Sequence, residues 1–335
     1  MGEAVAAGPS AGRAGRPSDD GARVVRTADG VTATAFGKVN LSLHVGAVEA
    51  DGYHPLRTIF QSLALAERVT VRATSSTPGR APVPVRVTGT DADRVPTDAS
   101  NLAVRAALAL AARTGRDPRV ALDVVKAVPV AGGMAGGSAD AAATLLALDA
   151  LWGTGLPRSD LLTLAAGLGA DVPFTVLGGT AEGLGRGDRL TPLPATGTFH
   201  WVLAVREEGL STAEVYRRFD AGGTPSSLAA GLDDELRAGL AAGDAARVGA
   251  HLHNDLQPVA VGLLPALGRT LDVAREVGAA GALVSGSGPT VAVLAHRADD
   301  VPGIVAALAE AGTSDRRIVT HGPAVPRGTA RRGGQ

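Results

Sequence analysis

The chain reads Pro129-Val130-Ala131-Gly132-Gly133-Met134-Ala135-Gly136-Gly137-Ser138-Ala139-Asp140 through its most glycine-rich segment. This segment follows the apolar run Val120–Val125, which is typical of a strand, and precedes an Ala- and Leu-rich run that predicts a helix from about 139 to 152. Glycines let the backbone approach a ligand closely and adopt positive φ angles. A helix N-terminus adds unpaired N–H groups and the positive end of the helix dipole. Together these features predict a site for a polyphosphate.

Other interpretations of the glycines remain open from local sequence. The segment also fits a flexible turn in which Ser138 is a plain N-cap. It matches neither a Walker A loop nor a Rossmann fingerprint, because no Gly-Lys-Ser/Thr follows and the glycine spacing differs. A second run, Gly183-Leu184-Gly185-Arg186-Gly187, suggests a nucleotide-binding dehydrogenase. That match is poor, because no βαβ unit or ribose-binding acidic residue follows it.

Composition excludes several classes of protein. The 335 residues are 45% apolar, which is ample for a core and suggests two domains. No run reaches the roughly 18 apolar residues that a membrane span needs. The net charge of −1, without a dense basic block, argues against a nucleic-acid partner. The absence of cysteine excludes disulfides and thiolate metal sites. We therefore expect a cytoplasmic protein with neither a membrane nor a nucleic-acid partner.

Element patterns divide the chain into two α+β halves. Residues 1–29 lack the apolar h-region of a signal peptide and are expected to be a disordered tail. The first domain is expected over 30–192, the second over 193–324, and a flexible tail over 325–335. Strands are predicted at 31–45, 58–74, 83–87, 120–125, 176–183, 190–193, 201–205, 282–284, 290–294 and 317–320. Helices are predicted at 101–113, 139–152, 160–167, 212–219, 228–240, 244–252, 265–277 and 301–311.

The glycine-rich segment resembles the loop of the GHMP kinase family, Pro-x-x-x-Gly-Leu-Gly-Ser-Ser. Ala135 and Ala139 stand where the closest pattern has Gly and Ser. The resemblance covers about residues 31–325 and implies a two-domain GHMP kinase fold. In that fold an ATP-binding domain like domain 2 of ribosomal protein S5 precedes a ferredoxin-like α/β domain. Three further blocks carry the match: Gly37-Lys38-Val39-Asn40-Leu41 with Asp51-Gly52-Tyr53-His54, Gly169-Ala170-Asp171-Val172-Pro173-Phe174, and Ser285-Gly286-Ser287-Gly288-Pro289-Thr290.

The resemblance implies transfer of the γ-phosphate of ATP to a substrate hydroxyl, with Mg²⁺ as the accompanying ion. The Gly-Lys-x-Asn and Asp-Gly-Tyr-His blocks are most similar to the branch that acts on a cytidylated methylerythritol of the non-mevalonate isoprenoid pathway. The implied partner is this small molecule, and the implied state is a monomer or weak homodimer. Two alternatives remain: another GHMP kinase of homoserine or mevalonate type, or a non-catalytic nucleotide- or RNA-binding relative.

The resemblance assigns the loop Pro129–Ala139 to ATP and Asp171 to the role of general base. It places Lys38 beside the acceptor hydroxyl, where an ammonium lowers the hydroxyl pKa and neutralises developing charge. Local sequence also fits purely structural roles for these two residues. Asp171 precedes Val172-Pro173 and suits a helix cap. Lys38 suits an exposed strand position, although the chain has only two lysines among its 32 basic residues.

The resemblance also assigns five substrate contacts. Asn40, two residues after Lys38 and therefore on the same face of a strand, contacts the methylerythritol. Tyr53 stacks on cytosine and His54 hydrogen-bonds its ring edge. Thr212 binds substrate hydroxyls and Tyr216 covers the other face of the cytosine. The alternatives are a turn Tyr beside a surface His, and Tyr216 as a core residue.

Lysine and histidine positions complete the candidates. Lys126, just before the loop, is expected to reach nucleotide phosphates or to lie at the surface. His251 and His253 are separated by one residue, a poor spacing for a metal site on a helix, and are interpreted as incidental. We therefore expect no metal site built from protein ligands alone, and expect Mg²⁺ to arrive with ATP.

Overall fold

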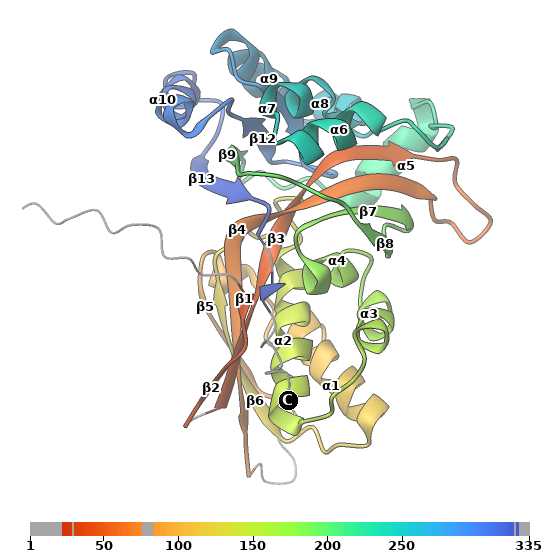
Figure 1. Cartoon of the computed structure of the whole chain (residues 1–335), viewed down its shortest axis with the longest axis vertical. Helices are drawn as coiled ribbons and strands as arrows, with labels where there is room; N and C mark the ends of the chain where they lie inside the picture. Colours follow the sequence, from red (N-terminus) through yellow and green to blue (C-terminus); the bar gives the residue numbers. More distant parts are fainter. Residues whose placement is uncertain (1–21, 29, 76–82, 325, 328–335) are drawn as a thin grey trace, which may run out of the picture.

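Two long antiparallel strands form the spine of the protein (Figure 1). The computed structural model describes residues 22–28, 30–75, 83–324 and 326–327. Strand β3 (Gly30–Val45) pairs with β4 (Leu56–Ala73) from Val31↔Val71 to Val45↔Leu56. The register of this pair shifts between Phe36 and Lys38 and again between Asn40 and Ser42. Such irregularities re-aim side chains, and these two lie on either side of Lys38 and Asn40.

The spine belongs to a mixed sheet with strand order β10-β3-β4-β6-β5, with β2 beside β3 and the β7–β8 hairpin beside β4. Strand β10, from the C-terminal half of the chain, pairs in parallel with β3. A short pair, β1 (Ala22–Arg23) with β14 (Pro326–Arg327), stands apart. The remaining strands of the sheet are β2 (Val25–Thr27), β5 (Val85–Gly89), β6 (Val120–Lys126), β7 (Thr180–Gly185), β8 (Arg189–Pro192) and β10 (His253–Asn254).

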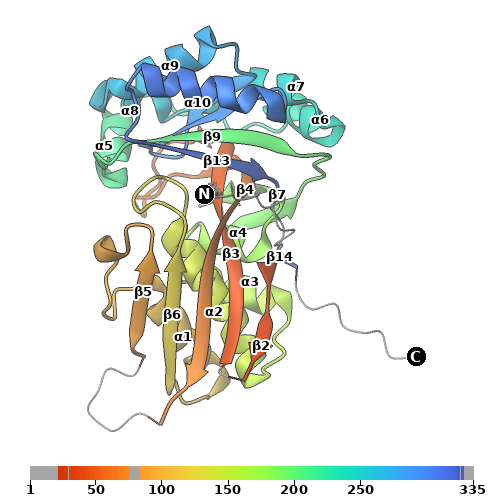
Figure 2. The same cartoon turned by 90° about the vertical axis from the view of Figure 1, so that its left-hand side faces the viewer.

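Four helices lie on one side of this sheet, behind its strands in Figure 2. They are α1 (Leu102–Thr114), α2 (Gly136–Trp152), α3 (Arg158–Ala166) and α4 (Val172–Leu177). The small side chains of α2, from Ala139 to Ala143, are fully buried, so this helix packs closely against β3, β4 and α1. Its N-terminal end therefore lies beside the spine, where β3 carries Lys38.

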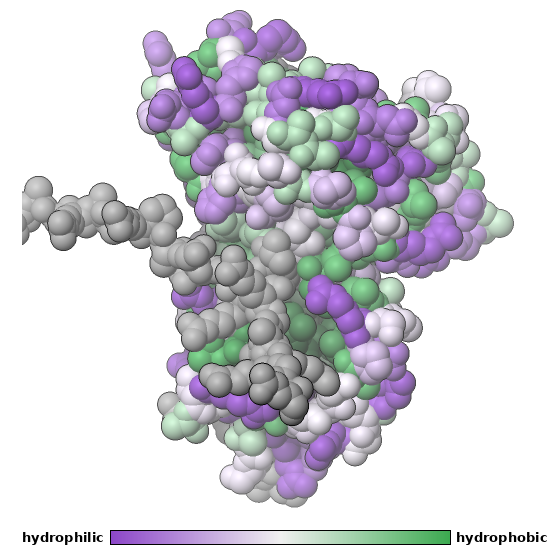
Figure 3. Space-filling view, viewed as in Figure 1, coloured by the Kyte–Doolittle hydropathy of each residue, from purple (hydrophilic) through white to green (hydrophobic). Residues whose placement is uncertain are grey.

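A second sheet lies above the first, with antiparallel order β11-β12-β9-β13. One of its two inner strands, β9 (Phe199–Val205), is apolar and buried apart from His200, because one face covers β3 and β4 and the other packs under helices. Figure 3 shows hydrophilic side chains over this upper helical layer and hydrophobic ones recessed below it. The other elements are β11 (Gly281–Val284), β12 (Val291–Leu294), β13 (Arg316–Gly322), α5 (Thr212–Gly222), α6 (Asp234–Ala242), α7 (Ala245–Ala250), α8 (Gln257–Leu263), α9 (Ala266–Glu276) and α10 (Val301–Glu310).

The predicted α+β fold in two halves is confirmed, and most predicted elements are found. The strand predicted over 176–183 is wrong at its start, because α4 (Val172–Leu177) occupies those residues and β7 begins only at Thr180. Pro173 in the first turn favours this helix. The helix predicted over 228–240 begins at Asp234. The helix at the glycine loop begins at Gly136, three residues earlier than predicted.

The tails predicted over 1–29 and 325–335 need correction where the structure describes them. Val25–Thr27 pairs antiparallel with β3, and Ala22–Arg23 pairs with Pro326–Arg327, so these residues form strands. Short strands broken by charged residues carry little periodicity, which explains the error. The rest of both predicted tails lies outside the described residues, apart from residues 24 and 28. Within the described parts of the chain, no helix has both the length and the apolar character needed to cross a membrane.

Candidate active site

Lys38 is buried on β3 and is held from two directions. Its backbone N–H donates to Met134 O at 3.0 Å, which joins the strand to the glycine loop. Its Nζ donates to Asn40 Oδ1 at 2.6 Å, and Asn40 Nδ2 donates to Thr58 Oγ1 at 2.9 Å. Only 4% of the surface of Lys38 is exposed, so the alternative that Lys38 is an exposed strand residue is wrong. This chain of bonds fixes the ammonium in one position.

Asp171 lies opposite this ammonium. It occupies the N-cap position of α4, yet its side chain makes no capping hydrogen bond to the described residues. Instead Oδ2 lies 3.7 Å from Lys38 Nζ, and 36% of the side chain is exposed. The structure therefore brings the two residues together, and the Asp171 carboxylate is free to accept a proton from a ligand.

The glycine loop packs against the block Ser285–Thr290. Gly133 has a φ of +72°, and a Cβ there would lie 2.2 Å from Ser285 O. Ser285 Oγ donates to Gly133 O at 3.2 Å. Ala135, the N-cap of α2, has a φ of 59°, which explains why glycine suits this position in the related pattern. Ser138 is not an N-cap, because it lies within the first turn of α2.

Two acidic residues anchor the backbone of the loop. Glu67 accepts from the N–H groups of Ala127 at 3.0 Å and Val128 at 3.2 Å. Asp91 accepts from Val130 N–H at 3.1 Å and forms a bidentate pair with Arg316 of β13, at 3.0 and 2.9 Å. The Arg316 hydrogen bonds, together with the Val130 N–H, hold the pKa of Asp91 below its ordinary value. The upper sheet is thus tied to the loop through one ion pair.

Lys126 lies under the loop in a buried cluster. Its Nζ lies 2.8 Å from Glu67 Oε1 and 2.6 Å from Asp140 Oδ2. Burial raises the pKa of Asp140 to about 7 against the opposing charge of Lys126, and burial likewise raises the pKa of Glu67. Burial disfavours the charged form of Lys126 and lowers its pKa. Attraction to the carboxylates of Asp140 and Glu67 has a larger, opposite effect, so the pKa of Lys126 is raised overall. A surface position for Lys126 is therefore wrong, and its ammonium is engaged beneath the loop.

Two cavities meet at the loop. The larger, about 730 Å³, contains both Lys38 and Asp171, and the smaller, about 350 Å³, follows the loop and α2. Gly133, Ala135 and Ser138 line both. These three residues therefore lie where the two cavities adjoin. The smaller cavity is also lined by Arg94, Val95, Pro96, Ser100, Asn101, Leu102, Lys126, Val128–Gly132, Met134, Gly136, Gly137 and Asp140.

The far end of the larger cavity is aromatic. The rings of His54 and Tyr216 lie 5.0 Å apart at 42°, and His54 Nε2 lies 2.7 Å from Asp220 Oδ1. Burial, reinforced by the charge of Asp171, raises the pKa of Tyr216 to about 12, so its hydroxyl stays protonated. Tyr53 is half-exposed at the rim, and Thr212 Oγ1 lies 2.9 Å from Ser287 Oγ. All five predicted substrate residues line this cavity.

Sequence reasoning did not identify three charged residues of the same cavity, which are Arg186, Arg217 and Asp220. The Arg186 guanidinium lies 3.7 Å from the Tyr53 ring centroid and pairs with Asp51 at 2.9 Å. Asp220 orients His54 from α5. Arg186 lies in the glycine run that suggested a dehydrogenase. That run ends β7 and turns into β8, so the strand–helix order of a dinucleotide site is not found there.

Comparisons with known proteins identify the family of the chain. The model described as GHMP kinases N terminal domain matches residues 101–179, and that described as GHMP kinases C terminal matches residues 236–314. The chain is 52% identical over 295 residues to 4-diphosphocytidyl-2-C-methyl-D-erythritol kinase of Thermobifida fusca (strain YX), covering 88% of this chain and 96% of the relative. Its counterpart in Streptomyces coelicolor (strain ATCC BAA-471 / A3(2) / M145) is 50% identical, covering 84% and 93%.

Solved structures give the same result. The crystal structure of a 4-(cytidine 5'-diphospho)-2C-methyl-D-erythritol kinase is 32% identical, has a TM-score of 0.69, and covers 87% of this chain and 98% of its own. A homoserine kinase from Cytophaga hutchinsonii has a TM-score of 0.67 at 19% identity, covering 89% and 95%, which is a likeness of fold alone. The chain therefore belongs to the GHMP kinase family.

Proposed function

We propose that the chain phosphorylates the 2-hydroxyl of 4-diphosphocytidyl-2-C-methyl-D-erythritol with ATP, a step of the non-mevalonate route to isoprenoid precursors. The observation that carries this proposal is the facing pair of Lys38 and Asp171, 3.7 Å apart, in a cavity that shares its loop residues with a second cavity. In this role Asp171 accepts the hydroxyl proton and Lys38 stabilises the developing alkoxide.

The residues around the loop fit ATP. The first-turn N–H groups of α2 and the loop glycines suit the phosphate oxygens, since a helix N-terminus favours anions. Ser138 lines both cavities, so its hydroxyl would be an oxygen ligand for the Mg²⁺ that accompanies ATP. When bound, that ion neutralises charge on the transferred phosphoryl group.

The aromatic end of the larger cavity supports a cytosine. His54, oriented by Asp220, presents its other ring nitrogen to a base edge, and Tyr216 offers a ring face beside it. Tyr53 and Arg186 lie at the mouth, where a stacked ring and a guanidinium suit a base and a diphosphate. Asn40 and Thr212 line the same cavity, Asn40 beside Lys38, and suit the hydroxyls of the polyol.

A substrate panel tests the proposal. The purified chain is incubated with Mg-ATP and the cytidylated methylerythritol, or with homoserine or mevalonate, and ADP release is followed. We expect turnover with the cytidylated compound alone. His54→Ala is expected to raise the KM for that compound while leaving the KM for ATP unchanged. Turnover with homoserine or mevalonate instead would refute the cytosine assignment. ATP binding without turnover of any compound would instead contradict the proposed acceptor.

A further inference from the structure

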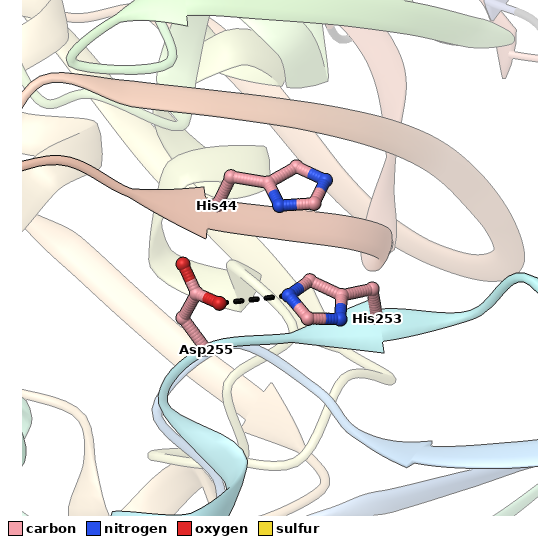
Figure 4. Close-up of side chains that lie close together, drawn as sticks. All are labelled: His44, His253 and Asp255. Atoms are coloured by element: carbon pink, nitrogen blue, oxygen red, sulfur yellow. Dashed lines mark hydrogen bonds and ion pairs between the residues drawn. The ribbon is translucent and has the colours of Figure 1, made fainter. Parts of the chain in front are cut away.

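Three side chains that commonly bind metals meet at the β3–β10 pair, outside the catalytic cavity (Figure 4). The parallel register sets His253 against Ser42, so the side chains of His253 and His44 project on the same face. The N–H of Asp255 donates to Leu43 O at 3.0 Å, which brings its carboxylate to the same place. The potential ligand atoms of His44, His253 and Asp255 all lie within 4.8 Å of one another.

His44 is oriented by a buried carboxylate. Its Nε2 lies 3.1 Å from Asp233 Oδ1, and Asp233 is 3% exposed. Figure 4 shows the second ring nitrogen of His44, Nδ1, on the side that faces His253 and Asp255. A carboxylate on the distal nitrogen is the usual support of a metal-bound imidazole, because it fixes the tautomer and the ring orientation.

Asp255 is oriented in the same manner. Its Oδ2 accepts from Val45 N–H at 2.7 Å and from Ser226 Oγ at 2.6 Å. Its Oδ1 is thereby directed at Nε2 of His253, 2.7 Å away. One oxygen of the carboxylate is thus held by the protein, and the other is presented together with two imidazole nitrogens.

We propose that this cluster binds one divalent transition-metal ion, of which Zn²⁺ is the reference, through His44 Nδ1, His253 Nε2 and Asp255 Oδ1. The ion takes the place of the proton shared by His253 and Asp255, and that proton passes to solvent. Two imidazoles with one carboxylate are a donor set suited to Zn²⁺ and its first-row neighbours. The bound ion would join β3, which carries Lys38, to the C-terminal segment at β10.

The geometry requires one adjustment. Metal–ligand bonds of about 2.1 Å place tetrahedral ligand atoms about 3.4 Å apart. The rings of His44 and His253 are now stacked, with centroids 4.5 Å apart, so one ring has to tilt toward the ion. His253 is the ring that can move, because 48% of its side chain is exposed. His253 and Asp255 also line a surface cavity of about 640 Å³, which gives the ion a path and an open coordination position.

Metal titration of the full chain tests the proposal. After EDTA treatment and dialysis, Zn²⁺ binding is measured by calorimetry and Co²⁺ binding by its visible absorption. We expect one Zn²⁺ per chain, a rise in Tm on binding, and a Co²⁺ spectrum typical of nitrogen and oxygen ligands. Zn²⁺ affinity is expected to fall more than about tenfold in His253→Ala, and about 10–100-fold in Asp233→Asn, as for supporting carboxylates elsewhere.

The matched control is His251→Ala. His251 lies two residues before His253, and the substitution removes an exposed imidazole that bonds Arg247 O. This variant is expected to bind Zn²⁺ as the parent does. Equal affinity in the His251 and His253 variants would overturn the site, as would a parent chain that binds neither Zn²⁺ nor Co²⁺. Because these readouts do not depend on turnover, failure here leaves the proposed kinase activity untouched.

Discussion

Nζ of Lys38 lies 3.7 Å from Oδ2 of Asp171, although one residue comes from the middle of β3 and the other from the start of α4. This separation exceeds a hydrogen bond, so the two groups do not fully satisfy each other. The ammonium instead donates to Asn40 Oδ1 at 2.6 Å. A hydroxyl placed near both groups would therefore meet a proton acceptor and a cation at once.

The first prediction concerns Asp171→Asn. We expect kcat to fall by about 10²–10⁴-fold, because the amide cannot accept the hydroxyl proton. The midpoint of thermal unfolding should not change, since the side chain does not cap α4. ADP release and thermal unfolding measure the two effects, with nucleotide binding as the control. Near-normal turnover would remove Asp171 from the mechanism.

The second prediction compares two glycines of the loop. Gly133→Ala should lower the free energy of unfolding by about 1–3 kcal/mol, because alanine is strained at positive φ and its Cβ meets Ser285 O. Gly137→Ala is the control, since its Cβ makes an ordinary 3.5 Å contact with Leu102 and the residue lies in α2. There alanine should be neutral or stabilising by up to about 1 kcal/mol. Equal stability of the two variants in urea unfolding would contradict the prediction.

The third prediction concerns the ion pair between the upper sheet and the loop. Arg316→Gln removes the bidentate partner of Asp91, whose carboxylate holds Val130 N–H. Charge-assisted bonds are worth roughly 1.5–3 kcal/mol, so we expect the KM for ATP to rise about tenfold with a smaller change in kcat. Arg317→Gln, the neighbouring arginine that bonds Ser314, is the matched control. An unchanged KM in the Arg316 variant would show that the loop holds its shape without β13.

The fourth prediction concerns the pH dependence of stability. Burial raises the pKa of Asp140 to about 7 in the folded chain from an ordinary 3.8. Between these pH values the folded state binds more protons than the unfolded state, so this group's contribution to stability is present at low pH and is lost as pH rises. The loss amounts to at most about 1.4 kcal/mol per pH unit.

Asp140→Asn should remove that slope. We expect the difference in unfolding free energy between the parent and the variant to shift in favour of the variant as pH rises from about 4 to about 7. Asp117→Asn, which removes an exposed carboxylate, is the control. Urea unfolding at a series of pH values measures the difference. A pH-independent difference would mean that Asp140 keeps its charge beside Lys126 throughout this range.

Local features of the site were predictable because they depend on neighbours in sequence. The loop at the start of α2 follows from its glycines and from the helix-forming run after it. The shared face of Lys38 and Asn40 follows from strand alternation, and their hydrogen bond agrees with it. The start of α2 was misplaced by three residues, since glycine and serine are weak helix formers whose place in the first turn is set by tertiary packing.

Other features depend on contacts between distant segments. Asp220 meets His54, Arg316 meets Asp91, and Arg186 covers Tyr53, each across a large separation in sequence. His253 follows the helix predicted over 244–252, and only the structure places it on β10 against His44 of β3. The helix and strand periodicities of the sequence describe only neighbouring residues, so they could not predict these pairings.

The amino-acid sequence by itself determined the α+β class, the glycine loop that precedes a helix and the shared strand face of Lys38 and Asn40, because strand alternation, glycine conformation and helix initiation are local properties. Tertiary structure alone decided that Lys38 is buried, that Asp171 faces it rather than capping α4, and that Lys126 is enclosed by two carboxylates. These outcomes depend on burial and on the pairing of charges, and both arise only when distant segments pack together.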